Sequence, residues 1–590
     1  MIKERLAALR AKMQEAGIDV YVVPSGDFHC SEYVSAYFRA VCFISGFTGS
    51  AGTVVVTQDE ALLWTDGRYF LQAEHQIEGT GFTLMRMAVA GVPTVAEYLA
   101  QTLADGQVLG FDGRIVSLKL AEEWRGKLGE KQVRFEAGRD LIGEIWTDRP
   151  AQEFHGAWLL DEKYTGESAA AKLARVREAM QEKNAGAFIL SAMDDIAWLL
   201  NLRGADVPNN PVVFAFAYVD KVQALLFVKE EAISAEVKAA LAAQGVEIRP
   251  YEAFWGLETP EGTPVLLDKA KTAYTVAARV RDAVAAVNPT TLMKCVKNPT
   301  EQEALRESHR KDGVAMVKWL YWLEHHPDRE ALSEIDVSDY LETCRREAGA
   351  FDLSFNTIAA MGPNAAMMHY SATPEAFAML ENKGMLLVDS GGQYPDGTTD
   401  ITRTIAMGPL TEEERLHYTA TLRSMLRLSS AKFLEGTTCY FLDILARGPI
   451  WDMGLDYRCG TGHGVGFCLN VHEGPNGFRW TKPADMDGLV TLKPGMVTTD
   501  EPGVYMDGRY GIRIENELLC VDAETTEYGH YLRFETLTLC PIDLRPVIPE
   551  LLTVYEKIAL NEYHAMVYER LRDGLTAEEA AWLREVTQAI

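Results

Sequence analysis

Residues 385–404 read MLLVDSGGQYPDGTTDITRT, and this stretch decides how the second half of the chain folds. An apolar run ends at Asp389, a glycine-rich turn follows, and a second strand-like run begins at Asp400. The pattern predicts a hairpin whose two carboxylates face inward. Carboxylates gathered in this way are stable only when cations neutralise them, because burying an unpaired carboxylate costs several kcal/mol.

A second pair of carboxylates repeats this arrangement further along the chain. Glu501 follows an apolar and threonine-rich run and precedes the breaker Pro502, whereas Glu515 lies inside the strand-like run 511–516. At a period of two, Arg513 and Glu515 share one face of that run, so both side chains should be directed at one locus. We therefore expect a second carboxylate hairpin that resembles the first.

The segment between the two hairpins is rich in glycine and contains His463 in GTGHGVG and His472 in NVHEGP. Glycines let the backbone approach a bound group closely. A lone histidine in such a run is more often a turn or core residue, but the four carboxylates favour His463 as a ligand. Oxygen-rich ligand sets with one imidazole are typical of manganese, cobalt or magnesium. We expect two divalent ions, with Mn²⁺ as the first choice.

Five segments resemble the metal-binding segments of the X-Pro aminopeptidases, also called aminopeptidase P, which are pita-bread metallopeptidases. In this chain they read LLVDSGGQYPDGTTDITRT, GTGHGVG, NVHEGP, DEPGVY and GIRIENE. Their order and spacing argue strongly against a chance match. Residues 45–53 and 64–69 resemble the first domain of this family, and Trp582-Leu583 resembles its final helix. The resemblance thus covers essentially the whole chain.

The resemblance implies a role for each metal ligand. Asp400 and Glu515 would bridge the two ions, Asp389 would bind one ion, and His463 and Glu501 would bind the other. The nucleophile would be a dimetal-bridged hydroxide. Glu501 would also carry a proton from the water to the leaving proline nitrogen, because a prolyl amide is a poor leaving group.

The resemblance also implies the residues that contact substrate. His369 and His472 match two histidines that are not ligands and that stabilise the tetrahedral oxyanion. Tyr505 matches a residue of the proline pocket, and Phe355 is a second candidate for its wall. Arg513 is a further candidate for a substrate contact, because it shares one face of its run with Glu515.

Cys459 departs from the family pattern, because relatives often carry another histidine at this position, four residues before His463. A nucleophilic thiol would need a base and an acid beside it, and no such arrangement is readable in the sequence. We interpret Cys459 as a small residue of the substrate pocket.

An internal repeat organises the first half of the 590-residue chain, which is too long for one core. The segment from Leu6 to Glu15 recurs at Leu173 to Glu182, and both copies predict an amphipathic helix that leads into a buried strand. We expect an α/β and α+β architecture. Two similar creatinase-like α/β domains should occupy 1–160 and 161–298, and a pita-bread catalytic domain should occupy 299–590. Helices are expected there over about 300–325, 333–348, 411–434 and 438–450.

The charge, the cysteine pattern and the hydropathy of the chain limit which partners and which cellular location we expect. The net charge of −28 argues against a nucleic-acid partner. Nine cysteines without a C-x-x-C pair, and an N-terminus that reads as a charged amphipathic helix, indicate a reduced, cytoplasmic protein. No apolar run reaches the roughly 18 residues of a membrane span, so no membrane attachment is expected. The resemblance implies peptides with a penultimate proline as substrates and a homodimer as the assembly.

Three other functions are compatible with the fold. An X-Pro dipeptidase, or prolidase, performs the same chemistry on dipeptides, but its homologues normally lack the duplicated N-terminal half. Creatinase uses no metal, which the complete ligand set argues against. A catalytically inactive pita-bread binding module would be expected to lose one or more ligands, and none is missing here. We therefore expect a metal-dependent X-Pro aminopeptidase that cleaves the bond between an N-terminal residue and a penultimate proline.

Overall fold

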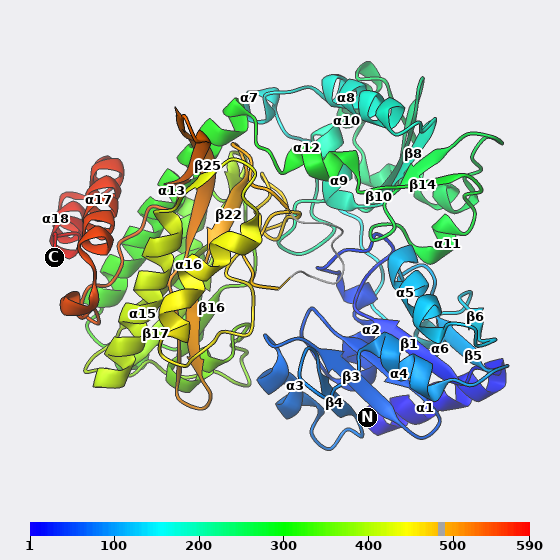
Figure 1. The fold of residues 1–590 in the computed structure, drawn as a ribbon, viewed down its shortest axis with the longest axis horizontal. Coiled ribbons are helices and arrows are strands. Elements are labelled where there is room, and N and C mark those ends of the chain that lie inside the picture. The colour runs from blue at the N-terminus through cyan, green and yellow to red at the C-terminus, as the bar shows by residue number, and fades with distance from the viewer. Residues whose placement is uncertain (482–489) are drawn as a thin grey trace. The chain divides into compact units, whose positions relative to one another are not determined.

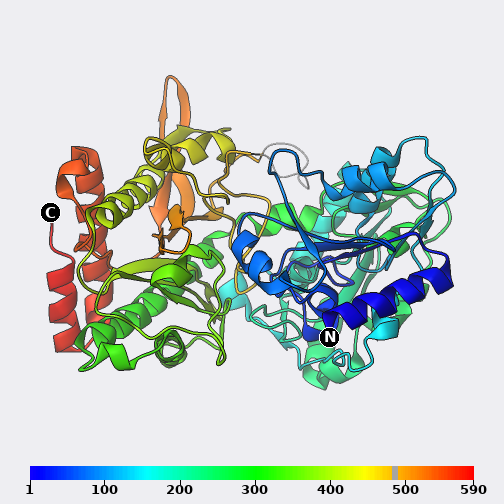
Figure 2. The same cartoon turned by 90° about the horizontal axis from the view of Figure 1, so that it is seen from below.

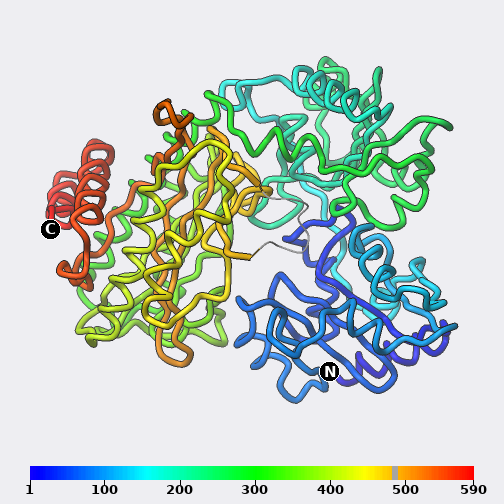
Figure 3. The backbone as a smooth tube through the Cα atoms, in the orientation of Figure 1, coloured from blue at the N-terminus to red at the C-terminus, as the bar shows by residue number. Residues whose placement is uncertain are grey.

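The computed structural model describes residues 1–481 and 490–590 of the chain (Figure 1). These residues form two compact units. The first comprises Met1–Asp161 and Glu167–Thr291, and the second comprises Glu162–Gly166 and Leu292–Ile590. Figure 3 traces the backbone of both units, from blue at the N-terminus to red at the C-terminus. In the described parts of the chain, none of the helices combines the length and the hydropathy that a membrane span requires.

The first unit contains two six-stranded mixed sheets with the same topology. One sheet has the order β4-β3-β2-β1-β5-β6, and the other has the order β12-β11-β10-β8-β13-β14. In each sheet the first strand along the chain pairs antiparallel with one neighbour and parallel with the other. The strands of the first sheet are β1 (Val20–Pro24), β2 (Thr53–Val56), β3 (Ala61–Thr65), β4 (Thr83–Arg86), β5 (Val108–Phe111) and β6 (Arg134–Glu136). Those of the second are β8 (Ala187–Leu190), β10 (Ala215–Asp220), β11 (Ala224–Val228), β12 (Val246–Pro250), β13 (Val265–Leu267) and β14 (Ala283–Ala285).

The repeated helix introduces each sheet in the same way. Helix α1 (Ile2–Ala16) buries Leu6, Leu9 and Met13, and helix α8 (Ala169–Glu182) buries their counterparts Leu173, Val176 and Met180. The first helix is capped by Gly17, whose φ of 64° is the left-handed conformation that glycine adopts without strain. Figure 2 shows α1 running along one side of its sheet. The predicted duplication is confirmed, whereas the domain boundaries at 160/161 and 298/299 stay predictions.

The second unit is built on antiparallel strands. One sheet has the order β16-β17-β20 and another has the order β21-β26-β25-β22. Their strands are β16 (Ile358–Met361), β17 (Met385–Ser390), β20 (Ile401–Ala406), β21 (Lys432–Leu434), β22 (Val497–Asp500), β25 (Asn516–Thr526) and β26 (Gly529–Thr536). Shorter strands form small sheets: β15 (Asp352–Leu353), β18 (Gly392–Tyr394) and β19 (Gly397–Thr398), and separately β23 (Gly503–Met506) and β24 (Tyr510–Arg513).

Long helices cover these strands. They are α13 (Pro299–His325), α14 (Glu334–Glu347), α15 (Glu412–Ser429), α16 (Cys439–Trp451), α17 (Val554–Leu571) and α18 (Ala577–Val586). One apolar core joins α13 and α14 to β16, β17 and β20, and another joins α15 and α16 to β25 and β26. Figure 1 shows α17 and α18, in red, beside α13. The helices thus fill one face of the strands, which leaves the opposite face of β17 and β20 for the carboxylates.

One sequence-based expectation was wrong in detail. The helix predicted over 411–434 ends at Ser429, and Lys432–Leu434 form an edge strand in which only Phe433 is buried. Pairing with β26 decided this outcome, which local periodicity does not report.

The second carboxylate hairpin forms as expected. Strand β22 pairs with β25 and β23 pairs with β24 in one continuous antiparallel register, with Asp500 opposite Asn516 and Gly503 opposite Arg513. This register places Glu501 opposite Glu515, which lies in the short link between β24 and β25.

Candidate metal centre

Asp389 and Asp400 are placed by the alternation of side chains along two paired strands. Leu386 and Val388 of β17 belong to the core that α13 and α14 complete, so Asp389 points to the opposite face. In the register of β17 with β20, Asp389 lies opposite Thr402, which follows Asp400 by two residues. The first predicted hairpin is therefore present, with both carboxylates on the side away from the helices.

Four of the five predicted ligands converge directly. Ligand atoms of Asp400, His463 and Glu515 all lie within 4.8 Å of one another. His463 Nε2 is 3.4 Å from Asp400 Oδ2 and 3.5 Å from Glu501 Oε1. Residues far apart in the sequence thus present one nitrogen and several oxygens to a single small volume, which is the donor set of a hard divalent cation.

Arg513 connects Asp389 to this cluster. Its Nη2 donates to Asp389 Oδ2 at 2.5 Å, and its Nε donates to Thr402 Oγ1 at 3.0 Å. Thr402 Oγ1 in turn donates to Glu515 Oε2 at 2.6 Å. The prediction that Arg513 and Glu515 share one locus is confirmed, while Ile514 between them is buried in the apolar core. A substrate contact of Arg513 stays a prediction, since its observed partners are ligands and their neighbours.

Several carboxylates share this small volume, and Arg513 forms an ion pair with one of them, Asp389. Burial raises the pKa of Asp400 and of Glu515 well above the usual range, and the neighbouring carboxylates add to both shifts. Two oxygens, Asp389 Oδ1 and Glu515 Oε1, are buried without a hydrogen-bond partner among the described residues. The second oxygen of each carboxylate is held by Arg513 or Thr402. The free oxygens and the raised pKa values fit residues that hold divalent metal ions.

The ring of His463 is oriented for binding a metal through Nε2. Its Nδ1 lies 2.9 Å from the carbonyl oxygen of Gly464, so Nδ1 carries the proton and donates it there. The Nε2 lone pair is then free and faces Asp400 and Glu501. A carbonyl that fixes the tautomer in this way is typical of metal-binding histidines.

Glu501 is held by two threonines that the sequence analysis did not single out. Its backbone nitrogen donates to the carbonyl oxygen of Thr461 at 2.8 Å, and Thr499 Oγ1 donates to its Oε1 at 3.1 Å. Thr499 Oγ1 also accepts from the backbone nitrogen of His463 at 3.0 Å. Thr499 therefore ties two ligands to one strand. Its signal in the sequence was its position two residues before Glu501, on the same face of the strand.

His472 lies beside the metal ligands. Its ring stands 4.2 Å from that of His463, centroid to centroid, with the two planes at 67°. The position of His369 follows from that of its neighbour Met368. The carbonyl oxygen of Met368 lies 3.5 Å from Arg513 Nη2, and the same nitrogen donates to Asp389. Both predicted histidines are thus near the centre, and neither belongs to the ligand cluster itself.

Glu334 fastens the segment that carries His369. Its buried carboxylate accepts from the backbone nitrogens of Met361 and Ala378 at 2.7 Å each, and from the hydroxyl of Tyr370 at 2.8 Å. The sequence analysis missed Glu334, because it lies in the first turn of α14 with only an ordinary capping pattern around it. Glu334 therefore binds both ends of the segment between Met361 and Ala378, which contains His369.

Tyr505 and Cys459 belong to one small apolar cluster around Val504. The Tyr505 hydroxyl accepts from Arg513 Nη1 at 2.7 Å, which fixes the ring near the ligands. Cys459 is partly buried, and its backbone carbonyl accepts from Arg447 at 3.0 Å. The place of both residues in the substrate pocket stays a prediction.

Phe355 is less well supported. It is half-buried in the connection between β15 and β16. Among the described residues, no hydrogen bond, ion pair or ring contact joins it to a ligand or to Tyr505. Its place in the proline pocket stays a prediction.

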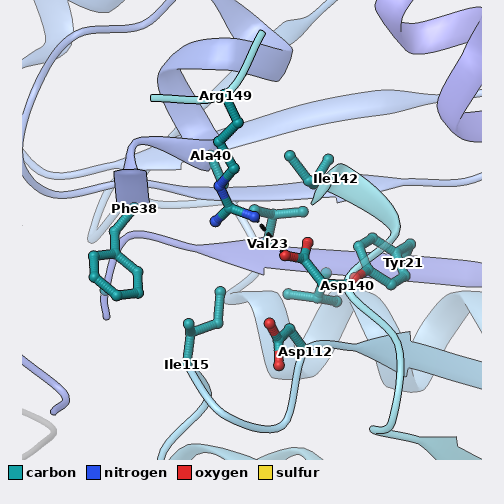
Figure 4. A pocket seen from close by; sticks show the side chains of 11 residues that line it. Tyr21, Val23, Phe38, Ala40, Asp112, Ile115, Asp140, Ile142 and Arg149 are labelled. Carbon is teal, nitrogen blue, oxygen red and sulfur yellow. Dashed lines mark hydrogen bonds and ion pairs between the residues drawn. The ribbon is translucent and has the colours of Figure 1, made fainter. Parts of the chain in front are cut away.

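The first unit offers no rival site of comparable chemistry. A cavity beside β1 is lined by residues that include Asp112, Asp140 and Arg149, and Arg149 Nη1 donates to Asp140 Oδ2 at 2.6 Å (Figure 4). Its volume is about 10 Å³, close to the smallest space that holds one water molecule. Asp112 pairs with Arg114 beside the cavity, and the small volume leaves no room for a substrate.

Comparisons with known proteins cover the whole chain. The creatinase/prolidase N-terminal domain matches residues 5–142 and again residues 148–301. Metallopeptidase family M24 matches residues 303–522, and the C-terminal region of that peptidase family matches residues 530–590. The repeated match agrees with the two sheets of equal topology.

Individual relatives match nearly all of this chain. The chain is 41% identical to a probable Xaa-Pro aminopeptidase P of Sordaria macrospora, with 99% of this chain and 98% of that protein covered. It is 38% identical to aminopeptidase P2 of Arabidopsis thaliana, with 99% and 88% covered. The crystal structure of an X-prolyl aminopeptidase of Caenorhabditis elegans, described as a cytosolic enzyme with a di-nuclear active site, superposes with a TM-score of 0.94. That structure is 33% identical and covers 100% of both chains.

Proposed function

The chain belongs to the Xaa-Pro aminopeptidase P family of M24 metallopeptidases, and we propose that its five clustered ligands hold the two metal ions of the reaction. It is a metallo-aminopeptidase that hydrolyses the bond between an N-terminal residue and a penultimate proline. The observation that carries the ligand assignment is the convergence of Asp400, His463 and Glu515 within 4.8 Å, beside two buried oxygens that lack a partner among the described residues.

We propose that Asp400 and Glu515 would hold both ions, that Asp389 would hold one of them, and that His463 and Glu501 would hold the other. The contacts support this division. Asp400 and Glu515 belong to the central cluster, and His463 lies between Asp400 and Glu501. Asp389 instead reaches the cluster from the side of Arg513. We propose Mn²⁺ as the native metal, because four carboxylates and one imidazole form a harder donor set than zinc prefers.

When bound, two such ions supply an activated water as the nucleophile near neutral pH. The rest of the chemistry falls to protein groups. We assign Glu501 to take a proton from the attacking water and to deliver it to the proline nitrogen as that bond breaks. Thr499 holds Oε1 of this carboxylate, which leaves Oε2 to exchange the proton. Without this proton the leaving group would be an amide anion.

His369 and His472 are assigned to the scissile carbonyl. Negative charge develops on its oxygen as the water attacks, and an imidazole N–H that donates to this oxygen lowers the barrier. Tyr505, held against Arg513, is assigned to one wall of the proline pocket. The rigid ring would select for proline by shape.

A peptide panel tests this function. Chelated enzyme is reconstituted with Mn²⁺ and incubated with Arg-Pro-Pro, Arg-Ala-Pro and the dipeptide Arg-Pro, and mass spectrometry follows the products. We expect release of arginine from Arg-Pro-Pro at a rate at least about tenfold above that from Arg-Ala-Pro. Equal cleavage of the alanine peptide would contradict the specificity, and preference for Arg-Pro would indicate a dipeptidase. Higher activity with Zn²⁺ than with Mn²⁺ would contradict the metal assignment.

Cys459→Ser should retain most of the activity. The hydroxyl is close in size to the thiol, and the nucleophile is assigned to a water and not to sulfur. Steady-state kinetics on Arg-Pro-Pro, with metal analysis of the same sample, measures the effect. A fall of about a thousandfold with both metals still bound would require a direct chemical role for the thiol.

We also propose a homodimer and a cytoplasmic location. The outer face of α16 exposes Phe441, Ile444 and Trp451, and Trp480 contacts Trp451, which together form an apolar surface suited to a second copy of the chain. All nine cysteines, each within the described residues, are free thiols, which suits a reducing compartment. A monomer in sedimentation equilibrium at micromolar concentration, or enrichment outside the cytosolic fraction, would contradict these two proposals.

A further inference from the structure

One loop of the catalytic unit carries both histidines that lie beside each other at the centre. We call residues 463–476 the active-site loop. It begins at the ligand His463 and contains His472 near its other end, and several of its residues are glycines. Backbone hydrogen bonds join its two arms, since the nitrogen of Glu473 donates to the carbonyl oxygen of Gly464 at 2.7 Å. The loop has little regular secondary structure, so side-chain contacts contribute much of what holds its shape.

Two lysines outside this loop bind to it. Lys294 Nζ lies 3.1 Å from Glu473 Oε2, and Lys297 Nζ lies 2.6 Å from Glu473 Oε1. Lys297 Nζ also donates to the carbonyl oxygen of Val465 at 2.5 Å. We call Lys294, Lys297 and Glu473 the lysine clamp. Because Val465 and Glu473 belong to opposite arms of the loop, Lys297 holds both arms with a single ammonium group.

The three side chains of the lysine clamp are almost completely buried. The side chains of Lys294, Lys297 and Glu473 are 2%, 1% and 2% exposed. Removing three charges from water costs several kcal/mol per ion, and the pairing recovers this only when the geometry is good. Apolar residues of similar volume often stabilise a fold as well as, or better than, such a buried ion group. An arrangement this costly points to a requirement for fixed position.

The residue that the clamp fixes is adjacent to His472. Glu473 follows His472 directly, so anchoring its carboxylate restricts where the imidazole of His472 can lie. The imidazole needs such restriction, because a donor misplaced by about 1 Å loses much of its effect on the developing charge. Lys294 ends the short helix α12 (Pro289–Lys294) and Lys297 lies two residues before α13, so both are outside the segments that carry the ligands.

We propose that Lys294 and Lys297 are positioning residues for the reaction, and that they act through Glu473 on the imidazole of His472. The segment that enters the catalytic unit is then a working part of its active site. The inference rests on the proposed role of His472 as an oxyanion donor.

Lys297→Met tests the clamp most severely, because it removes contacts to both arms of the loop. We expect kcat on Arg-Pro-Pro to fall about ten- to a hundredfold, the range typical of groups that orient a residue at a metal site, with KM and metal content near wild type. Lys297→Arg keeps a cation and should recover part of the loss. Lys294→Met leaves Lys297 paired with Glu473. Because this remaining pair is neutral overall, Lys294→Met should disturb folding less than Lys297→Met. Its kcat should fall by a smaller factor in the same direction.

Lys432→Met is the matched control. Lys432 pairs with Glu524 in the same unit, with 52% and 54% of the two side chains exposed, so it removes a lysine from an ion pair without touching the loop. Its kinetics should equal those of the wild type. Thermal unfolding of every variant identifies any that fails to fold.

A double-mutant cycle decides whether the clamp acts through His472. In the His472→Ala background, Lys297→Met should change kcat by less than about twofold, because the group that it positions is absent. A full additional loss in that background would overturn the proposal, and so would loss of metal in Lys297→Met or unchanged kcat in both lysine variants. If instead His472→Ala alone leaves kcat unchanged, the proposed role of His472 fails, and the clamp fails with it.

Discussion

Glu501→Gln is expected to abolish turnover of Arg-Pro-Pro, with a fall in kcat of at least about a thousandfold. The amide is the same size but cannot take a proton from the attacking water or deliver one to the proline nitrogen. It is also a weaker ligand, so the occupancy of the ion shared with His463 should fall as well. Steady-state cleavage assays and metal analysis on the same preparation separate the loss of proton transfer from the loss of metal.

The matched control is Glu524→Gln, which makes the same change on an exposed part of β25 and should leave kcat unaltered. Retention of more than about a tenth of wild-type activity in Glu501→Gln would mean that another group transfers the proton. Saturating Mn²⁺ should not rescue the variant, because the missing proton transfer remains when the metal is restored.

Replacing either of the two histidines by alanine should cut kcat by about two to three orders of magnitude, equivalent to about 3 to 4 kcal/mol per donor. His369 and His472 donate to charge that exists only in the transition state, so KM should change little. Neither side chain is assigned as a ligand, and both variants should keep their metal content. Kinetics and metal analysis of His369→Ala and His472→Ala measure this.

His530→Ala, on the β25–β26 hairpin, is the control for loss of a histidine in the same unit and should behave as wild type. Stoichiometric loss of metal in either active-site variant would show that the residue is a ligand. An unchanged kcat would remove that residue from the reaction.

The ligands were predictable from sequence because each lies at the end of a short run whose alternation fixes which side chains share a face. Asp389 and Asp400 follow this rule, and so does the pairing of Arg513 with Glu515. The duplicated sheets were predictable for a similar reason, since a helix and a strand recur in the same order.

The contacts that support the ligands were not predictable in this way. Thr402 and Thr499 are ordinary strand residues until their hydroxyl contacts are seen. The hydroxyl of Thr402 joins Arg513 to Glu515, and that of Thr499 joins His463 to Glu501. The contact of Lys297 with Glu473 spans 176 residues, and nothing in the local sequence of either residue indicates the other.

The central claim is that five residues hold two metal ions in one site, and an anomalous difference map of Mn²⁺-reconstituted crystals tests it most directly. The account predicts two peaks per chain, both in contact with Asp400 and Glu515, with Asp389 on one and with His463 and Glu501 on the other. A single peak in fully active crystals, or two peaks with any of the five residues outside coordination distance, would contradict it.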